Sequence, residues 1–441
     1  MGNAPRASVV RHLPARWHIE TVAAPRNGVA LDAESASAAA LARPRAGLPL
    51  RELAQGKRNT VIALDAFPAD PLRQTLLRAV LRELQAEAQS QPTLLLAADT
   101  APSPVDLPAD LRAQVRLLWH DPQDQRDLDT IGVFEGITFW LNYHVLAADL
   151  LIAISVLRID DETTHAGCYH TLLRLTARST QQDLREARFF DGSAESGTEV
   201  SLLERALHEL ARRAGLSFAL EALEDEQGRL LAVFAGMPSG VRAAMQRRIA
   251  ELREAPVRHA AYDALVLAAP RRRPQSLFEA ASTVVSQGLS PTSVLAHDGV
   301  LIVPVTGDMG DQSAAAQAFY DALTNADSPE QAVHLLRGRA LREGEERAYL
   351  LAHLMQRHRV IAVGAPHERL ARNSHFIPAR NLMEALEITE SLVDHPPRVL
   401  LIKRPRVTRP VFSPFLATLD DILDAHERQP SSKLMRIAKH S

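Results

Sequence analysis

The sequence predicts an α/β protein with two domains and a parallel or mixed sheet in each. Three observations support this fold class. Short apolar runs alternate with amphipathic stretches of helical period, which is the pattern of strand–helix–strand units around a buried parallel sheet. A chain of 441 residues is longer than a single hydrophobic core usually accommodates, so it is expected to divide into domains. The alternating pattern restarts near Pro256, which places the boundary there.

The first domain is expected over residues 1–255. An amphipathic helix is predicted from Leu72 to Glu87, because leucines and valines recur on one stripe of it. Polar residues predict a loop-rich stretch over 158–198. The strands are predicted at 60–65, 93–98, 115–119, 139–142 and 150–157. The other elements are a helix over 199–214, a hairpin over 217–235 and a helix over 241–254.

The second domain is expected over residues 256–405 as a smaller α/β series. A tail over 406–441 carries a short amphipathic helix, Phe415 to His426, and a polar end. The strands of the second domain are predicted at 264–268, 299–303, 359–364 and 398–402. Its helices are predicted at 277–287, 313–325, 328–337, 341–357 and 382–392.

Composition narrows the classes of function and partner. The chain has 50 basic and 53 acidic residues and a net charge of −3, which gives no electrostatic case for a nucleic-acid or membrane partner. The longest apolar run, Val145 to Leu157, is interrupted by Asp149 and is shorter than the roughly 20 residues of a membrane span. Cys168 is the one cysteine, so no intramolecular disulfide forms, which suits the cytoplasm.

Several segments in the same order carry a family resemblance. They include His120-Asp121, Ile131-Gly132 with Gly136, Leu141-Asn142, and Ala148-Asp149-Leu150, followed later by Tyr262-Asp263 and the strand Gly299 to Val303. Their order and spacing resemble those of the nickel-dependent lactate racemase family over most of the chain. The resemblance implies two α/β domains with a ligand site in the cleft between them, where such folds bind ligands.

The resemblance also implies a chemistry whose side chains are missing. Members of that family racemise a 2-hydroxy acid through a nickel-pincer nucleotide tethered to a lysine, with two histidines exchanging the hydroxyl proton. Here Pro68 stands at the position of the substrate-binding arginine, Ala101 and Thr163 stand at the two histidines, and Leu173 stands at the lysine. The nickel ligand has no counterpart between 171 and 207, where there is no histidine.

The implied cofactor therefore lacks its anchor and its ligand, and racemisation by the family mechanism is not expected. General acid–base assistance is worth roughly a hundred to ten-thousand-fold for each group. The expected partner is a small anion or hydroxy acid, and neither a homo-oligomer nor a partner protein is excluded.

The segment 160–170 offers replacement chemistry. On a helix, Asp161, His165 and Cys168 would share one face, and their oxygen, nitrogen and sulfur atoms suit zinc or another late transition metal. His165 and His170 are also candidate catalytic residues. The alternative is a polar connector with scattered histidines and one buried thiol.

Two acids end predicted strands of the first domain. Asp65 is a candidate catalytic residue and Asp99 a candidate ligand-binding residue, because acids at strand ends can orient a hydroxyl or an amine. The alternative is that each caps the following helix.

The second domain contributes the remaining candidates for ligand binding. Arg271, Arg272 and Arg273 follow its first strand, and three guanidinium groups there suit a polyanionic ligand. Gly307 and Gly310 follow its second strand and can present backbone amides to a phosphate or carboxylate. The alternatives are a solvated arginine loop and an ordinary turn.

Three functions remain open at this stage. The leading one is a divergent lactate-racemase-like protein that binds or acts on a small hydroxy acid or other anion in the interdomain cleft. The second is a non-catalytic ligand-binding or partner subunit. The third is a metal-dependent enzyme that uses the 160–170 cluster.

Overall fold

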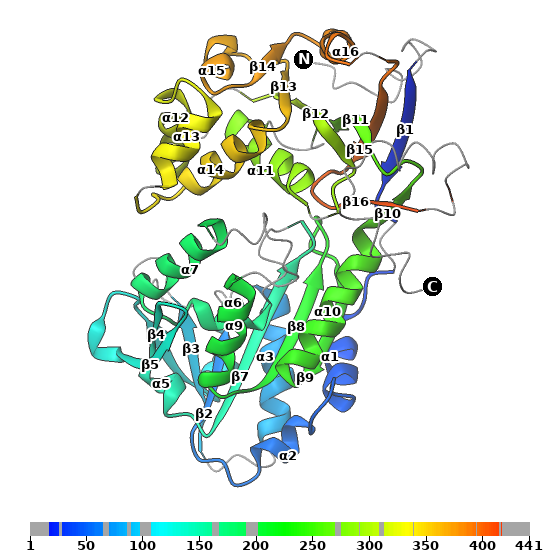
Figure 1. Ribbon diagram of the computed structural model, residues 1–441. Helices are drawn as coiled ribbons and strands as arrows, with labels where there is room; N and C mark the ends of the chain where they lie inside the picture. Colours follow the sequence, from blue (N-terminus) through cyan, green and yellow to red (C-terminus); the bar gives the residue numbers. More distant parts are fainter. Residues whose placement is uncertain are drawn as a thin grey trace, which may run out of the picture. The chain divides into compact units, whose positions relative to one another are not determined.

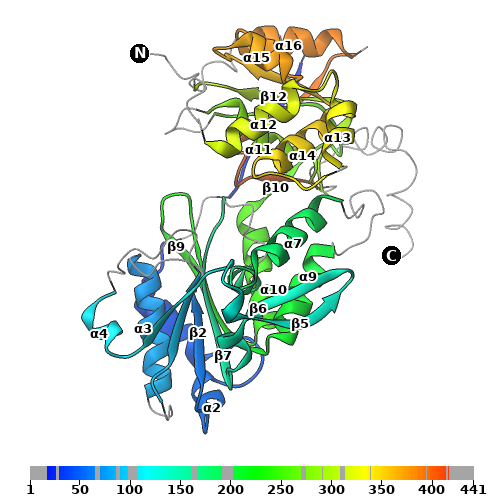
Figure 2. The ribbon, with the colours of Figure 1, turned by 90° about the vertical axis from the view of Figure 1, so that its left-hand side faces the viewer.

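The chain forms two compact units in a computed structural model. Residues 26–252 form one, called unit 2 here, and residues 1–25 together with 253–441 form the other, unit 1. The structure describes residues 17–25, 29–64, 70–85, 90–97, 107–160, 167–190, 202–269, 275–290, 292–307, 313–337, 339–393, 395–413 and 416. Figures 1 and 2 show the helices and strands of both units.

The core of unit 2 is a six-stranded sheet in the order β4-β3-β2-β7-β8-β9. Its strands are β2 (Thr60–Leu64), β3 (Thr93–Ala97), β4 (Arg116–His120), β7 (Leu150–Arg158), β8 (Leu216–Glu224) and β9 (Leu230–Gly236). All neighbouring pairs are parallel except β8 and β9, which form an antiparallel hairpin. Both faces are covered, which explains why the strands read as continuous apolar runs.

Alternate residues of each strand meet different helices. Ile152 and Ile154 of β7 face one core cluster, which also holds apolar residues of several helices. Leu151 and Ala153 face a second cluster with the helices on the other side. The first set of helices is α1 (Ala33–Ala42), α2 (Leu50–Ala54) and α3 (Pro71–Gln85). The second set is α6 (Cys168–Leu173), α7 (Arg178–Phe190), α9 (Leu202–Arg213) and α10 (Pro238–Arg253).

A two-stranded hairpin and two short helices complete the described part of unit 2. These are β5 (Leu128–Phe134) with β6 (Ile137–Asn142), α4 (Ala109–Arg112) and α5 (Tyr143–Leu146). Sequence analysis expected 139–142 as a strand, and it is one, but it pairs with β5 instead of joining the large sheet. The hairpin still packs on the core, because Ile137, Phe139 and Leu141 are buried.

Unit 1 is built on a second six-stranded sheet, entirely parallel, in the order β1-β15-β11-β12-β13-β14. Its strands are β1 (His18–Ala23), β11 (Tyr262–Leu267), β12 (Leu295–Pro304), β13 (Arg359–Val363), β14 (Ile377–Ala379) and β15 (Arg398–Lys403). A separate pair, β10 (Glu254–Val257) and β16 (Arg409–Phe412), lies outside this sheet.

The helices of unit 1 pack around this sheet. Leu386 of α16 packs with Trp17 on apolar residues of the sheet. A group of helices in mutual contact holds α14 at its centre, between α11, α12 and α13. The helices are α11 (Leu277–Gly288), α12 (Ala314–Thr324), α13 (Pro329–Arg337), α14 (Glu345–Met355), α15 (Glu368–Asn373) and α16 (Leu382–Ser391).

The predicted α/β fold class is confirmed. The position of residues 18–23 differs from expectation: Figure 1 shows β1 beside β15, in the unit that the C-terminal part of the chain forms. The stretch 158–198 is also less irregular than expected, because α6 and α7 form within it and bury Leu172 and Leu184. The tail contains β16, and the helix expected over 415–426 lies outside the described residues except for Leu416.

Candidate functional site

The carboxyl edge of the unit 2 sheet is where a ligand site is expected. β2 lies between β3 and β7, so the chain leaves neighbouring strands toward opposite sides of the sheet. Open α/β sheets bind ligands at this switch point. Asp65 follows β2, Asp99 follows β3, and Asp161 and His165 follow β7 in the sequence. All four lie outside the described residues, so their roles stay predictions.

Charged side chains gather at this edge from three elements. Arg158 and Glu224 end β7 and β8 and are register partners, so their side chains leave the same face of the sheet. At the start of α3, Arg73 Nη1 lies 2.6 Å from Asp70 Oδ2. Arg158 Nε lies 3.3 Å from Asp160 Oδ1. We call Arg73, Arg158 and Glu224, with the acids beside them, the edge cluster.

The edge cluster changes how Glu224 titrates. Burial raises the pKa of the Glu224 carboxyl, and the negative charge of Asp70 raises it further, while Arg73 and Arg158 oppose that shift. A carboxyl group with a raised pKa can carry a proton closer to neutral pH, which suits general acid–base work. The Arg158 side chain is half-exposed and presents a guanidinium group at the same edge. The arrangement therefore places a guanidinium group, ion-paired with Asp160, beside a carboxyl group whose pKa is raised.

Sequence analysis missed Arg73, Arg158 and Glu224. Each was visible as a charged residue next to an apolar run, but so were many others. What unites Arg158 and Glu224 is the register of β7 against β8, and the two residues are 66 positions apart in the chain.

On the other face of the sheet, α6 begins over a buried carboxylate. The Cys168 backbone N–H donates to Glu221 Oε1 at 2.5 Å, and both residues are buried. Burial, followed by the charge of Glu221, raises the pKa of the Cys168 thiol well above its usual range. The thiol is thus held protonated, and a protonated thiol is neither a good nucleophile nor a good metal ligand.

The turn into α6 requires glycine. Gly167 has φ of +52°, and a Cβ there would lie 2.3 Å from Glu221 Oε1. His170 follows on α6, is partly buried, and its backbone N–H donates to the Gly167 carbonyl oxygen at 2.9 Å. The α6 segment is therefore firmly placed, and its two predicted site residues that the structure describes, Cys168 and His170, lie on it together.

The resemblance implies a lysine that tethers a nickel nucleotide, and the described residue at that position supplies none. Leu173 stands at the expected lysine position, and its partly buried side chain packs against the apolar cluster of α9 and β8. A hydrocarbon side chain supplies neither an amine to tether a cofactor nor a ligand atom. Among the described residues, no group of three or more His, Cys, Asp or Glu side chains is placed to hold a metal ion.

Unit 1 has its own groove at the carboxyl ends of β12 and β13. Ser276, Gly307, Tyr320 and His367 contribute to its lining. The Gly307 N–H donates to the Gln275 carbonyl oxygen at 3.1 Å, so this amide is engaged within the loop. Gly310 and the three arginines Arg271, Arg272 and Arg273 lie outside the described residues. Ligand binding by these five residues stays a prediction.

The two units define a class of protein: an α/β protein with the architecture of lactate racemase. The chain superimposes on the lactate racemase apoprotein of Thermoanaerobacterium thermosaccharolyticum with a TM-score of 0.72 at 18% identity, over 90% of this chain and 96% of the other. The expected resemblance is also present in sequence. The chain is 22% identical over 381 residues to lactate racemase from that organism, covering 82% of this chain and 87% of the relative.

A second solved structure shares the fold more loosely. It is a protein from Thermotoga maritima, with a TM-score of 0.55, 12% identity, and coverage of 88% of this chain and all of the other. No protein-family model matches the chain. No helix in the described part is both long and apolar enough to cross a membrane.

Proposed function

We propose that this protein binds a small hydroxy acid or a related carboxylate at the carboxyl edge of the unit 2 sheet, without a lysine-tethered nickel nucleotide. The observation that carries the proposal is the pairing of Arg158 with Glu224 at adjacent strand ends. In this proposal Arg158 binds the ligand carboxylate, and the Glu224 carboxyl group forms a hydrogen bond with the ligand hydroxyl.

The chemistry of the edge cluster supports this class of ligand. A guanidinium group is the natural partner of a carboxylate, since it offers two parallel N–H donors. The position is also appropriate, because a switch point at the carboxyl edge is where folds of this kind bind ligands. The sequence relative is a lactate racemase, and lactate belongs to the same class of small molecule.

The second half of the proposal rests on α6. Gly167 lies against the Glu221 carboxylate at the start of α6, and Leu173 stands at the position where the resemblance implies the tethering lysine. Without that lysine, a hydride-accepting cofactor has no covalent attachment at this position. We therefore propose that the protein binds its ligand through its own side chains. Any turnover would use these side chains or a cofactor that is not attached at position 173.

The experiment is calorimetric titration of the full-length protein with D-lactate, L-lactate and malate, comparing wild type with Arg158→Ala. A charge-assisted hydrogen bond is worth about 1.5–3 kcal/mol, so the substitution is expected to weaken binding by roughly 10- to 100-fold. Arg82→Ala is the matched control, because Arg82 is an exposed arginine of the same unit whose partner is Glu34. It is expected to bind as wild type does.

Two results would overturn the proposal. The first is an absence of saturable binding by any of these acids, or equal binding by wild type and Arg158→Ala. The second concerns the cofactor and is read by elemental analysis and intact-mass spectrometry of the purified protein. Stoichiometric nickel with a nucleotide mass on the chain would show that the tethered mechanism operates, and polarimetry with lactate would then measure it.

A further inference from the structure

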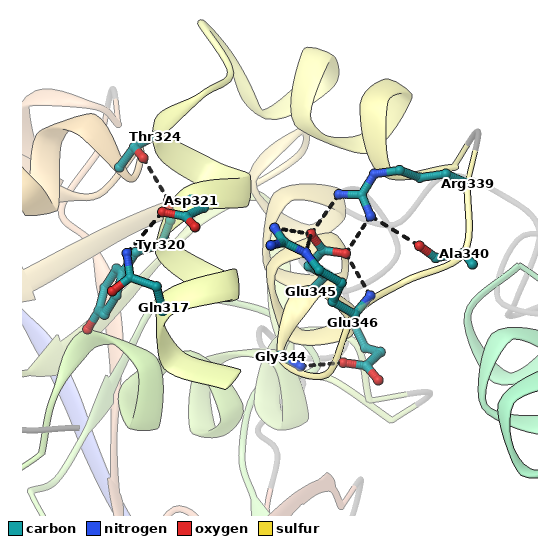
Figure 3. Close-up of polar contacts among 10 residues, drawn as sticks. Gln317, Tyr320, Asp321, Thr324, Arg339, Ala340, Gly344, Glu345 and Glu346 are labelled. Carbon is teal, nitrogen blue, oxygen red and sulfur yellow. Dashed lines mark hydrogen bonds and ion pairs between the residues drawn. The ribbon is translucent and has the colours of Figure 1, made fainter. Parts of the chain in front are cut away.

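A buried glutamate in unit 1 holds two arginines in place. Glu345, the first residue of α14, is fully buried. Its carboxylate accepts hydrogen bonds from Arg339 Nη1 and Nη2 at 2.6 Å each, from the Arg342 backbone N–H at 2.7 Å, and from Arg342 Nε at 2.8 Å. Figure 3 shows the Arg339 guanidinium group directed at this carboxylate from the loop before α14. Arg342 Nη2 also lies 2.7 Å from Glu345 Oε1.

The charges of this cluster do not cancel. Burial alone would raise the pKa of Glu345, but the hydrogen bonds from Arg339 and Arg342 outweigh it and hold the pKa at about 2. The carboxylate is thus ionised at neutral pH. Counting these three side chains, two guanidinium groups around one carboxylate leave an excess of one positive charge, while the neighbouring Glu346 carboxylate accepts the Gly344 N–H.

That excess charge faces solvent. The side chain of Arg339 is 46% exposed and that of Arg342 is 59% exposed, although the carboxylate between them is not exposed at all. Arg339 Nε and Arg342 Nη1 make no hydrogen bond within the described part of the chain, whereas the other guanidinium nitrogens of both residues bind Glu345. Arg339 Nη1 also donates to the Ala340 carbonyl oxygen at 3.1 Å. Each arginine therefore keeps at least one open N–H group.

A similar cluster in unit 2 shows what is particular about this one. Glu209 also accepts hydrogen bonds from two arginines, Arg212 and Arg213. Arg213, however, donates Nη1 to two backbone carbonyl oxygens of the β5 strand and lies over the ring of Phe139. The Arg213 side chain is only 23% exposed, so in the Glu209 cluster Arg212 is the arginine that faces solvent.

We propose that Arg339 and Arg342, held in place by Glu345, form a phosphate-binding site on the surface of unit 1. Ordering a long side chain on binding costs conformational entropy, and Glu345 has already imposed that order on both arginines. One guanidinium group alone already satisfies a planar carboxylate, so two groups anchored on the same glutamate suit an anion with more than two oxygens. The site takes either free phosphate or the phosphate group of a small monoester.

The test is titration of the intact protein with inorganic phosphate and with glycerol 3-phosphate at constant ionic strength, followed by calorimetry. Wild type is expected to bind at least one of them saturably. Arg342→Ala is expected to weaken binding at least tenfold. Arg212→Ala, which alters the Glu209 cluster, is the matched control and is expected to leave binding unchanged.

The two ligands separate the two sources of phosphate. Equal affinity means that the phosphate group alone is recognised, and tighter binding of the ester means that the site extends around its organic part. No saturable binding by wild type, or equal loss in Arg342→Ala and Arg212→Ala, would overturn the proposal. Because Arg342→Ala removes a partner of a buried carboxylate, its fold is checked by circular dichroism. Arg339→Lys keeps the positive charge but loses the paired N–H groups of the guanidinium. This second variant is also expected to bind phosphate more weakly than wild type.

Discussion

Two fully buried glutamates, one in each unit, are stabilised in different ways. Glu221 lies in the middle of β8 and accepts the N–H of Cys168, which fixes the start of α6. Glu345 lies at the start of α14 and is surrounded by two arginines. Burying a carboxylate is costly unless charges or hydrogen bonds compensate it. The comparison shows that unit 2 uses its buried carboxylate to position a segment, whereas unit 1 uses its own to position two cations.

The glycine beside each glutamate gives the largest expected effect. A Cβ at Gly344, where φ is +95°, would lie within 2 Å of the backbone carbonyl oxygen of Ala315, and backbone cannot move aside cheaply. Gly344→Ala is therefore expected to destabilise unit 1 by about 3 kcal/mol or more, measured by urea unfolding.

The control for that substitution lies in the same unit. Gly364 also has positive φ, +74°, but a Cβ there meets its nearest atom at an ordinary 3.4 Å. Gly364→Ala is expected to cost only about 1 kcal/mol of backbone strain. At Gly167 the obstacle is the end of the Glu221 side chain, so Gly167→Ala is expected to fall between the two. Equal losses at Gly344 and Gly364 would mean that the loop before α14 is not packed as described.

Acid titration probes the Glu345 cluster directly. The pKa of Glu345 is about 2 in the folded protein, against an ordinary value of 4.5. A lowered folded pKa contributes stability above the unfolded value, and this contribution is lost as pH falls from about 4.5 toward 2. By linkage the loss is up to about 3 kcal/mol. Unfolding free energies measured across this range should fall more steeply in wild type than in Glu345→Gln, and parallel profiles would contradict the assignment.

A buried histidine gives the corresponding prediction for unit 2. His120 Nε2 lies 3.0 Å from the Thr176 carbonyl oxygen, and Nδ1 lies 3.1 Å from Asn142 Nδ2, so a neutral ring with its proton on Nε2 satisfies both contacts. Burial lowers the pKa of His120 from its usual 6.5. Below pH 6.5 the unfolded chain binds a proton that the folded chain does not.

Unit 2 is therefore expected to lose stability as pH falls below 6.5, by about 1 kcal/mol per pH unit at most. Thermal unfolding of wild type and His120→Gln between pH 7.5 and 5.5 measures the effect, and the variant should show a weaker dependence on pH. His297→Gln serves as the control, because the His297 side chain is 70% exposed. A wild-type profile that stays flat over this range would show that His120 is not held neutral.

The sheets were predictable because their signal is local. Val61 to Leu64, Leu94 to Leu96 and Ile152 to Ile154 are apolar on both faces, and this is sufficient to indicate buried parallel strands. β1 was missed because its residues, His18 to Ala23, are mixed in polarity, and its partner β15 is some 380 residues away in the chain.

The candidate site was less predictable, because its residues come together only through contacts between distant parts of the sequence. Arg158 and Glu224 come together only through the register of two strands. Glu221 could not be recognised as the contact of Gly167 from the sequence, because that required knowing which face of the sheet it occupies. The resemblance directed attention to α6, which begins after Gly167 and ends at Leu173, although it did not indicate that Glu221 anchors this helix.

The smallest expected effect separates an anchor from a metal site. If Glu221 anchors α6 through the Cys168 backbone N–H, the thiol itself contributes little beyond its volume, and Cys168→Ala is expected to cost about 1 kcal/mol. The metal content of Cys168→Ala, measured by elemental analysis, is expected to equal that of wild type. Burial has raised the pKa of the thiol, so it does not readily lose the proton that it must release to bind a metal. Glu221→Gln, which keeps the volume but removes the charge that the N–H donates to, should cost more, roughly 1–3 kcal/mol. The opposite order, with loss of bound zinc in Cys168→Ala, would restore the cluster of Asp161, His165 and Cys168 as a metal centre.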